Sequence, residues 1–458
     1  MNPSGNKRVS YSPARLSRRR FLAATATASA FTVLPRHMLG GPGQTAPSEK
    51  VNIAGIGVGG MGGANLQALR SQNIVALCDV DHDYAAHTFK DYPNAKLYTD
   101  YREMLDKQKD IEAVVIATPD HTHAVLSMAA MRAGKHVYCQ KPLTHDVYEA
   151  RKLAEAAKEP GVVTQMGIQG HSTDDLRTVC EWIWDGAIGE VREVDAWCSL
   201  TYYPWGHESW SSSWGARPKE NPAVPPNLNW DLWLGPALFR PYHRAYHPAT
   251  WRCWWDFGCG MMGDRGAHTL DVVNWSLKLG PPVTVEATSC GMTADAHPLS
   301  AIVTFQFPAR ENLPPVRLTW YEGTRPPRPH EMDADVEWPA EGGTLFKGSK
   351  GLLMCGVYGN SPKLLPLSLH LDYKRPARTL PRIADHCHEL DWVRAIKSGQ
   401  QANASFAYSG PLTETCLLGN VAKRIDGLIE WDPANLKVKN SEAAGRLIRT
   451  TYREGWNL

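Results

Sequence analysis

Short apolar runs alternate with helical patterns from Val51 to about Gly170. Expected strands are 51–56, 74–77, 111–118, 136–139 and 162–167. Expected helices between or after them are 64–69, 124–133, 148–158 and 176–185. Continuous apolar strands that alternate with helices are typical of a parallel sheet with a helix layer on each face. The pattern therefore predicts a doubly wound α/β domain of the Rossmann type, which binds ligands beyond the carboxyl ends of its strands.

The pattern changes after Gly186. Strand-like runs at 190–200, 283–288, 302–307 and 316–320 lack helices of similar length between them, and helical patterns return at 387–397 and 412–426. A long segment rich in Trp, Pro and His, 202–258, is inserted after the first of these runs. We predict a first domain over 47–186 and a second, α+β domain over 187–458. The second domain is expected to contain an open, mostly antiparallel sheet with helices on one face.

The first 46 residues are expected to be a targeting segment and linker. Ser17-Arg18-Arg19-Arg20-Phe21-Leu22 matches a twin-arginine signal, and a modest apolar segment and a Gly/Pro-rich stretch follow it. This pattern predicts export of an already folded protein to the periplasm or cell envelope. The alternative is a disordered basic tail.

Composition and charge narrow the classes of function. The chain is 43% hydrophobic and 21% charged, as in a soluble globular protein. Residues 1–46 hold seven Lys and Arg and no acid, so the formal net charge of +2 becomes −5 without them. Nucleic-acid binding therefore has no electrostatic support. The ten cysteines contain no C-x-x-C pair, and we expect no metal site.

Three glycines follow the first strand in the spacing G-x-G-x-x-G. Gly57 permits a tight turn, Gly59 lets the backbone approach a pyrophosphate, and Gly62 allows close contact between helix and strand. Asp79 ends the second strand 22 positions after Gly57, near the offset at which a carboxylate accepts from ribose hydroxyls. A carboxylate there repels a 2′-phosphate, so NAD is favoured over NADP. The other residues of the turn predicted to contact the cofactor are Gly60 and Met61. The alternative is a glycine-rich turn that binds nothing.

Two further segments follow predicted strands and are placed at the binding edge of the sheet. The first runs from Thr118 and Pro119 to His123, where the nicotinamide ribose would lie. The second is Gln140-Lys141, and both residues are predicted to contact the cofactor. Lys141 there could also donate to a hydroxyl oxygen and stabilise an alkoxide. The histidines of the first segment either line the pocket or are ordinary loop or helix-capping residues. For Lys141 the alternative is a surface position.

A third segment, 260–271, supplies a carboxylate and an imidazole. Asp264 and His268 are four residues apart and face the same side of a helix. A histidine near neutral pKa is suited to removing a hydroxyl proton, and the carboxylate could orient it or bind a second hydroxyl. A helix start capped by Asp264 is the structural alternative.

The glycine motif, T-P-x-H-x-H, K-P and D-x-G-x-H-x-x-D occur in one order, and together they carry a resemblance. From Val51 onward the chain resembles the glucose–fructose oxidoreductase/inositol dehydrogenase/MocA family of NAD(P)-dependent sugar oxidoreductases. The resemblance implies that Lys141, Asp264 and His268 form the catalytic set, with His268 as the base. It also implies a C-terminal sheet that builds substrate and subunit contacts, often in dimers or tetramers. The usual acid before Lys-Pro is Gln140 here, which puts the cofactor contacts at that position in question.

The insertion is most similar to those of an exported bacterial subgroup with aromatic-rich inserts, which carry W-x-x-W-W-D-F-G as at 251–258. Tryptophans offer flat apolar faces to the C–H surfaces of sugar rings, and His or Asp can supply directional hydrogen bonds. Trp255, Asp256 and His247 are the predicted substrate contacts. Further candidates are Trp205, Trp210, Trp214, Trp251, Trp254 and His243. A core or interface role is the alternative for each tryptophan.

Together these features predict an exported enzyme that moves hydride between NAD and a secondary hydroxyl of a saccharide, glycoside or polyol. Redox-neutral glycoside cleavage or sugar–sugar oxidoreduction, both with retained NAD, is the alternative on the same fold. A non-catalytic saccharide-binding protein is a third interpretation.

Overall fold

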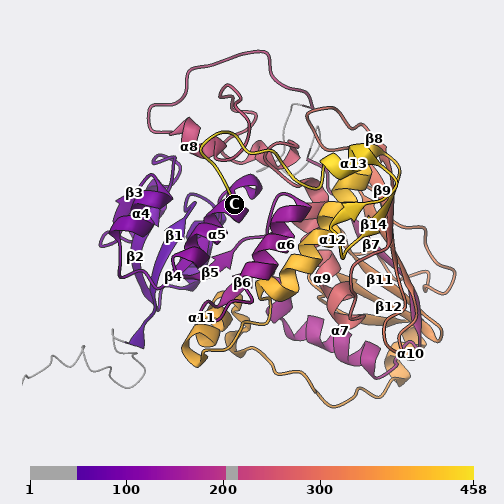
Figure 1. The fold of residues 1–458 in the computed structure, drawn as a ribbon. Coiled ribbons are helices and arrows are strands. Elements are labelled where there is room, and N and C mark those ends of the chain that lie inside the picture. The colour runs from indigo at the N-terminus through magenta and orange to yellow at the C-terminus, as the bar shows by residue number, and fades with distance from the viewer. Residues whose placement is uncertain (1–48, 203–214) are drawn as a thin grey trace, which may run out of the picture. The chain divides into compact units, whose positions relative to one another are not determined.

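The computed structural model describes residues 49–202 and 215–458, and Val51–Leu458 forms one compact unit (Figure 1). The twin-arginine motif and the predicted contacts Trp205, Trp210 and Trp214 lie outside the described residues. Within those residues no helix is both long and apolar enough to cross a membrane, and no three side chains are grouped as metal ligands.

The first sheet is parallel and six-stranded, with the order β3-β2-β1-β4-β5-β6. Its strands are β1 (Asn52–Ile56), β2 (Asn73–Cys78), β3 (Lys96–Tyr98), β4 (Ala113–Ile116), β5 (His136–Cys139) and β6 (Thr164–Met166). The predicted Rossmann-type fold is confirmed. Edge strand β3 was not predicted, because its three residues, none of them buried, are too few to form an apolar run.

The helices that accompany this sheet are α2 (Met61–Ala68), α3 (Ala86–Asp91), α4 (Tyr101–Lys107), α5 (Asp120–Arg132) and α6 (Val147–Ala156). After β6 come η3 (Gln169–Ser172) and α7 (Asp174–Trp184), and α7 packs on α9 (Ala267–Ser276) of the second half. Helix α5 begins at Asp120, directly after Pro119, and not at 124 as expected. Pro119 fixes an extended backbone at the N-cap, and the polar residues 120–123 form the first helical turn. These four side chains are buried, which places them at the inner end of the helix beside the sheet.

One face of the first sheet is completed by a segment from the far end of the sequence. Helix α11 (His388–Ser398) contributes Trp392 to the cluster that contains Val115 and Tyr138. Trp392 is fully buried, and its indole N–H donates to the backbone oxygen of Val163 at 3.3 Å. The first sheet therefore depends on residues more than two hundred positions beyond its last strand.

The second sheet has nine strands in the order β13-β12-β11-β7-β10-β9-β8-β14-β15, and only β7 and β10 pair in parallel. The expected strands are β7 (Val191–Cys198), β8 (Thr284–Cys290), β9 (Ser300–Phe307) and β10 (Val316–Glu322). Strands not foreseen are β11 (Gly342–Gly348), β12 (Gly351–Gly356), β13 (Lys363–Leu365), β14 (Leu428–Asp432) and β15 (Lys437–Val438). The expected mostly antiparallel sheet is confirmed.

Several helices of the second half pack on the second sheet. The main ones are η5 (Met262–Gly266), α9 (Ala267–Ser276) and α12 (Phe406–Ile425), which pack on β7, β8, β9 and β11 (Figure 1). Helix α12 also packs closely on α6, where Gly410 approaches the backbone of Ala150. The fully buried Lys423 ammonium contacts the Glu322 carboxylate at 2.8 Å and fixes α12 against β10. Shorter helices are α8 (Trp230–Leu234), η4 (Thr250–Cys253), α10 (Leu367–Asp372), η6 (Ala384–His386) and α13 (Glu442–Arg446).

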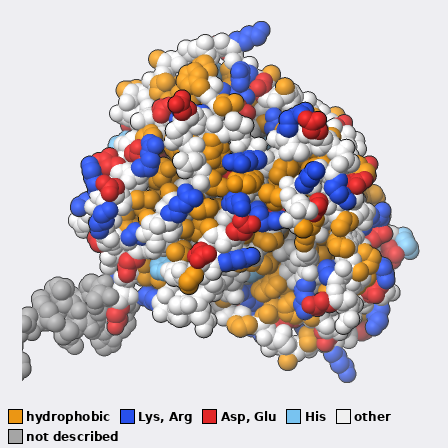
Figure 2. All heavy atoms as spheres, in the orientation of Figure 1, with side chains coloured by type: hydrophobic (Ala, Val, Ile, Leu, Met, Phe, Trp, Pro, Cys, Tyr) orange, Lys and Arg blue, Asp and Glu red, His pale blue; other side chains and the backbone are white. Residues whose placement is uncertain are grey.

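Charged side chains of both signs are interspersed over the face drawn in Figure 2. Hydrophobic side chains reach the surface between the charged ones. Neither sign of charge forms a large continuous patch on this face.

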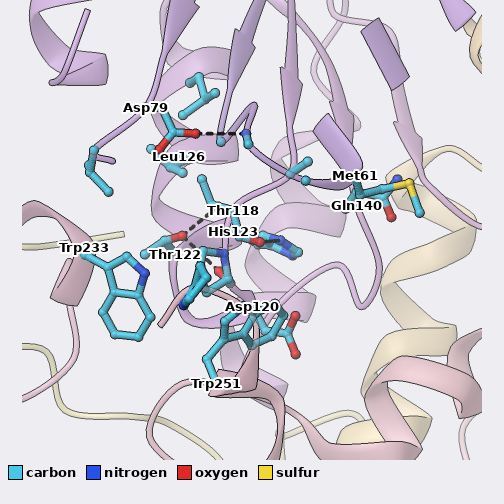
Figure 3. Close-up of a pocket in the computed structure, with 18 of the residues that line it drawn as sticks. Met61, Asp79, Thr118, Asp120, Thr122, His123, Leu126, Gln140, Trp233 and Trp251 are labelled. Atoms are coloured by element: carbon cyan, nitrogen blue, oxygen red, sulfur yellow. Dashed lines mark hydrogen bonds between the residues drawn. The ribbon is translucent and has the colours of Figure 1, made fainter. Parts of the chain in front are cut away.

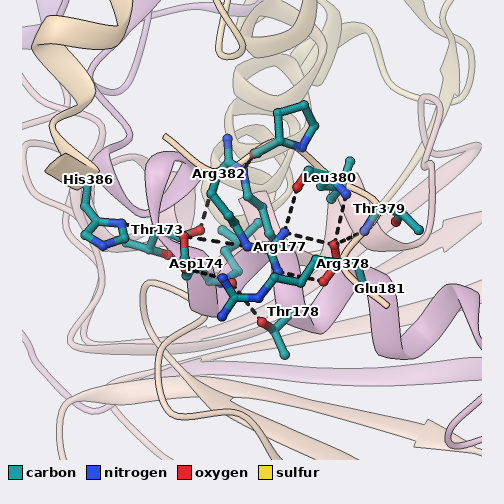
Figure 4. Close-up of polar contacts among 12 residues, drawn as sticks. Thr173, Asp174, Arg177, Thr178, Glu181, Arg378, Thr379, Leu380, Arg382 and His386 are labelled. Carbon is teal, nitrogen blue, oxygen red and sulfur yellow. Dashed lines mark hydrogen bonds and ion pairs between the residues drawn. The ribbon is translucent and has the colours of Figure 1, made fainter. Parts of the chain in front are cut away.

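A polar cluster fastens the segment 378–386 to α7 (Figure 4). The carboxylate of Glu181 accepts from the backbone N–H groups of Thr379 and Leu380 at 2.7 and 2.9 Å, and from both terminal nitrogens of Arg382 at 2.8 and 2.7 Å. The bonds from Arg382 are the main cause that lowers the pKa of Glu181 to about 2. The ionised carboxylate is thus favoured in the folded protein.

We expect Glu181→Gln to lower the free energy of unfolding by about 2 kcal/mol at neutral pH, because it removes a paired, buried charge. The folded pKa lies below the ordinary value of 4.5, so this stabilisation is complete above that pH and is lost as the pH falls toward 2. Urea unfolding at several pH values measures it. The control Glu430→Gln removes the exposed pair with Lys439 and should change the free energy of unfolding by less than about 0.5 kcal/mol. An equal effect of both variants would contradict the assignment.

Candidate active site

A cavity of about 500 Å³ lies at the carboxyl ends of β1, β2, β4 and β5 (Figure 3). Most of the predicted site residues line it: Gly57, Gly59, Gly60, Met61, Asp79, Thr118, Pro119, His123, Gln140, Lys141, His247 and Asp264. Gly62, His268, Trp255 and Asp256 do not line it. Side chains from both halves of the chain therefore meet at the edge where a Rossmann sheet binds ligands.

The glycine turn has no room for side chains at the positions the motif specifies. Gly57 has φ +75°, and a Cβ there would lie 2.8 Å from the backbone nitrogen of Thr118. A Cβ on Gly62 would overlap the carbonyl oxygen of Gly57, and one on Gly59 would overlap the ring of Tyr84. This close approach of helix to strand is the geometry that a dinucleotide-binding turn requires.

Asp79 connects the end of β2 to this turn. One carboxylate oxygen accepts from the N–H groups of Val58 and Gly59 at 2.7 and 3.2 Å, and the other accepts from Asp81 N–H at 2.9 Å. Burial raises the pKa of Asp79, and the three N–H donors oppose that rise. The glycine cradle and this oriented carboxylate fit a dinucleotide, with Asp79 at the place of the ribose hydroxyls.

His123 fixes the Lys141 loop to the end of β4. Its Nδ1 lies 2.7 Å from the carbonyl oxygen of Pro142, and its Nε2 lies 2.8 Å from that of Thr118. Burial opposes protonation, but Cys139 and the two carbonyls raise the pKa of His123 above its usual value. Both partners are acceptors, so the protonated ring donates to both. His123 thus positions the loop that carries Lys141.

His121 lies two residues before His123 on α5, and its ring contacts the backbone of the insertion. Its ring nitrogens lie 3.0 and 3.2 Å from the carbonyl oxygens of Trp233 and Phe257. Burial lowers the pKa of His121 to about 3, so this ring is neutral at physiological pH and, unlike His123, donates its single N–H to only one of the two carbonyls. The T-P-D-H-T-H segment therefore joins three parts of the site through two buried histidines.

Lys141 forms an ion pair with Asp264 at the floor of the cavity. Both side chains are mostly buried, with 15% and 12% of their surface exposed. Burial, followed by the charge of Arg252, lowers the pKa of Lys141, and the carboxylate of Asp120 opposes this. Asp120 also lines the cavity and accepts from Cys259 N–H at 2.9 Å. The site thus contains a buried lysine whose pKa is lowered and which interacts with the carboxylates of Asp264 and Asp120.

Asp264 lies in a π-helical turn, η5, which continues directly into α9. Such wide turns often occur at functional sites because they redirect a side chain. Here the turn directs Asp264 at Lys141, and the hydroxyl of Tyr202 donates to the second oxygen of the same carboxylate. Asp264 is therefore held within the helix by side-chain contacts and does not cap its start.

His268 lies behind this pair and is 5% exposed. Its ring meets the ring of Tyr358 edge-on at 4.8 Å, and Nδ1 has no hydrogen-bond partner among the described residues. Burial, followed by the charges of Lys141 and Arg265, lowers the pKa of His268 well below its usual value. These effects favour the neutral form of the ring.

Gln140 takes part in a buried polar chain that no motif of the sequence indicates. Its amide nitrogen donates to Asn65 at 3.0 Å, and Asn65 donates to Glu389 at 2.7 Å. The hydroxyl of Tyr138 donates to the same Glu389 oxygen at 3.2 Å. A carboxylate from α11 thus lies two side chains away from Gln140. No local pattern could reveal this, because Asn65 and Glu389 are 324 residues apart.

The three predicted substrate contacts of the insertion lie in two places. His247 lines the main cavity, but its Nε2 lies 2.7 Å from Asp81, on the side of Asp79. Trp255 and Asp256 line a second cavity of about 290 Å³, where Asp256 pairs with Arg240 at 2.5 Å. Trp251 lines the main cavity, whereas Trp254 is fully buried in the core.

We expect Gly62→Ala to weaken NADH binding at least tenfold, because the added methyl group must displace the Gly57 carbonyl from the turn. Fluorescence titration with NADH measures the dissociation constant, and circular dichroism checks the fold. The control Gly445→Ala lies in α13, where an added Cβ meets nothing within 4 Å, and it should bind NADH as the parent does. Unaltered affinity of Gly62→Ala would contradict the role of the turn.

Comparison with known proteins agrees with this architecture. Residues 51–168 match the oxidoreductase family with an NAD-binding Rossmann fold, and residues 196–308 match the C-terminal α/β domain of that family. A levoglucosan dehydrogenase of Pseudarthrobacter phenanthrenivorans is 28% identical over 31% of this chain and 39% of its own length. An inositol 2-dehydrogenase of Rubrobacter xylanophilus is 33% identical over 33% of this chain and 44% of its own. The chain thus spans less than half the length of these curated relatives.

Solved structures share the fold at low identity. The WlbA dehydrogenase of Bordetella pertussis, in complex with NADH and UDP-GlcNAcA, superposes with a TM-score of 0.58 at 16% identity, over 84% of this chain and 99% of that one. A levoglucosan dehydrogenase with NADH and levoglucosan gives 0.55 at 17% identity, over 83% and 99%. Since the two family matches together cover more than half of it, the chain belongs to the glucose–fructose oxidoreductase/inositol dehydrogenase/MocA family of NAD-binding oxidoreductases.

Proposed function

We propose that this protein transfers a hydride between NAD and a secondary hydroxyl of a saccharide, glycoside or polyol. The Lys141–Asp264 pair carries the proposal, because it lies in the same cavity as the glycine turn and Asp79. A cation at that place can stabilise the oxyanion that develops on a hydroxyl as its hydride leaves. The named activities of the relatives, on levoglucosan and inositol, support a sugar or polyol substrate.

The chain's own residues divide the work as follows. Bound NAD supplies the hydride acceptor. Lys141 donates to the substrate oxygen, and Asp264 balances the lysine charge and orients its ammonium. The resemblance to the family assigns the hydroxyl proton to His268, whose ring burial keeps in the neutral form. His123 and Tyr202 hold the two charged side chains in place.

We expect Lys141→Met to lower kcat/KM at least about a hundredfold, because the oxyanion loses its cationic donor. NADH formation is followed on a panel of hexoses, methyl glycosides, disaccharides, levoglucosan and myo-inositol. NADH affinity should change far less than turnover, since the glycine turn and Asp79 are untouched. The control Lys152→Met removes an exposed lysine paired with Glu155 and should leave turnover as it is. Equal turnover in Lys141→Met would refute the assigned role, and preference for free inositol would refute a glycoside substrate.

A second candidate, a closed redox cycle on retained NAD, is favoured by how the insertion lies over the cofactor cavity. The segment after β2 is bonded to the insertion at several points. Asn229 N–H donates to Val80 at 2.8 Å, His82 N–H donates to Asn227 at 3.1 Å, and His247 contacts Asp81. Trp233, His247 and Ala249 then form part of the cavity wall. Such a cover slows exchange, as sugar–sugar oxidoreduction or redox-neutral glycoside cleavage would require.

The second candidate predicts about one equivalent of NAD(H) in the purified protein, quantified by mass spectrometry after denaturation. We expect His247→Ala to speed NADH release at least severalfold, because it removes the contact with Asp81 while leaving the glycine turn intact. Stopped-flow displacement of NADH measures the rate. An empty protein with rapid exchange in both forms would favour ordinary dehydrogenation.

Export by the twin-arginine route and assembly into dimers or tetramers remain proposals. Cell fractionation of the full chain and of an Arg18→Lys, Arg19→Lys, Arg20→Lys variant would test the first. Light scattering of the purified protein would test the second.

A further inference from the structure

The carboxylate of Asp264 is engaged on both of its oxygens. Lys141 contacts Oδ1, the hydroxyl of Tyr202 donates to Oδ2, and the guanidinium of Arg252 lies 3.8 Å from Oδ2. Tyr202 is 5% exposed and follows β7, whereas Lys141 follows β5. Two residues that follow strands of different sheets thus share one carboxylate, each through its own oxygen.

Tyr202 acts on this carboxylate as a hydrogen-bond donor. Burial raises the pKa of its hydroxyl well above the usual value, so the proton stays on the oxygen. A hydroxyl that donates to a carboxylate offsets part of the negative charge. The remaining charge, and with it the attraction for the Lys141 ammonium, is smaller than an unshared carboxylate would exert.

We propose that Tyr202 is a positioning residue: by donating to Oδ2 of Asp264, it limits how tightly Asp264 holds Lys141 and leaves the ammonium free to turn toward the substrate oxygen. The consequence for catalysis rests on the proposed function, whereas the effect on Lys141 does not. An ammonium bound too firmly by its counter-ion is a poorer donor to substrate, because each donated bond must displace that counter-ion. The hydroxyl of Tyr202 thus changes the strength of the Lys141 ion pair through Asp264, which contacts both residues.

Other charged or titratable groups also face Lys141. They are Asp120 on α5, Arg252 on η4, Arg265 on η5 and His268 on α9. Each remains in place when Tyr202 is replaced by Phe, which keeps the buried ring and removes only the oxygen. A change in the titration of Lys141 in that variant therefore reports the lost hydroxyl.

The test compares Tyr202→Phe with Tyr92→Phe, which removes a buried hydroxyl that has no hydrogen-bond partner among the described residues. The rate of acylation of Lys141 by acetic anhydride is followed by peptide mass spectrometry as a function of pH, without substrate. We expect Tyr202→Phe to raise the pKa of Lys141 by about half a unit or more, since the unshared carboxylate favours the ammonium. Tyr92→Phe should leave it unchanged.

Two further measurements connect this shift to the site. In an Asp264→Asn background, Tyr202→Phe should no longer move the titration of Lys141, because the shared carboxylate is gone. With a substrate in hand, Tyr202→Phe should lower kcat about tenfold with less than about a twofold change in KM. The basic limb of its pH–rate profile should move upward with the lysine.

An unchanged or lowered pKa of Lys141 in Tyr202→Phe overturns the proposal, as does an equal shift in the Asp264→Asn background. The acylation measurement needs no turnover. A protein that oxidises no sugar would therefore refute the proposed function while leaving this result to stand by itself. Loss of kcat without any shift of Lys141 would also overturn it, because the hydroxyl would then act in another way than through the charge on Asp264.

Discussion

The ion pair between Lys141 and Asp264 is the constraint on which the rest of the site depends. Lys141 comes from the edge of the first sheet and Asp264 from the π-turn before α9, so the pair joins the two halves of the unit. Both groups are mostly buried, and losing either leaves an unpaired charge at a cost of about 3–5 kcal/mol. Because both charges must stay paired, neighbouring side chains hold the lysine loop and the carboxylate in place. His123 holds the lysine loop, while Tyr202 and Arg252 face the free side of the carboxylate.

The fold could be predicted from the sequence wherever an element carries its own signal. The five predicted strands of the first sheet are apolar and buried, and they appear as such. Strands β3, β13 and β15 are two or three residues long, and β11 and β12 carry glycines at their ends, so their apolar patterns are weak. The start of α5 was placed four residues late because its first turn is polar yet buried.

The site could be predicted where topology alone brings residues together. Asp79, Thr118 and Lys141 each follow a parallel strand, and carboxyl ends of parallel strands meet at one edge. Residues contributed by other parts of the fold could not be predicted in this way. Tyr202 follows a strand of the second sheet, and Glu389 contacts Asn65 although the two lie 324 residues apart in the sequence. The tryptophan-rich insertion was ambiguous for another reason. The same residue type fills the core at Trp254, lines the main cavity at Trp251 and lines a second cavity at Trp255.

The burial of Trp392 against the first sheet has a consequence for how the protein is made. Strands β1 to β6 leave the ribosome complete, but the apolar surface they present to Trp392 stays open until α11 emerges. At about 5–20 residues per second, that interval is on the order of 10 to 45 seconds. During it the nascent half-protein exposes an aggregation-prone face, so its yield in cells should depend on chaperones that bind nascent chains. Expression of residues 51–186 alone would prolong that exposure indefinitely, and a soluble nucleotide-binding fragment would have to include the segment around Trp392.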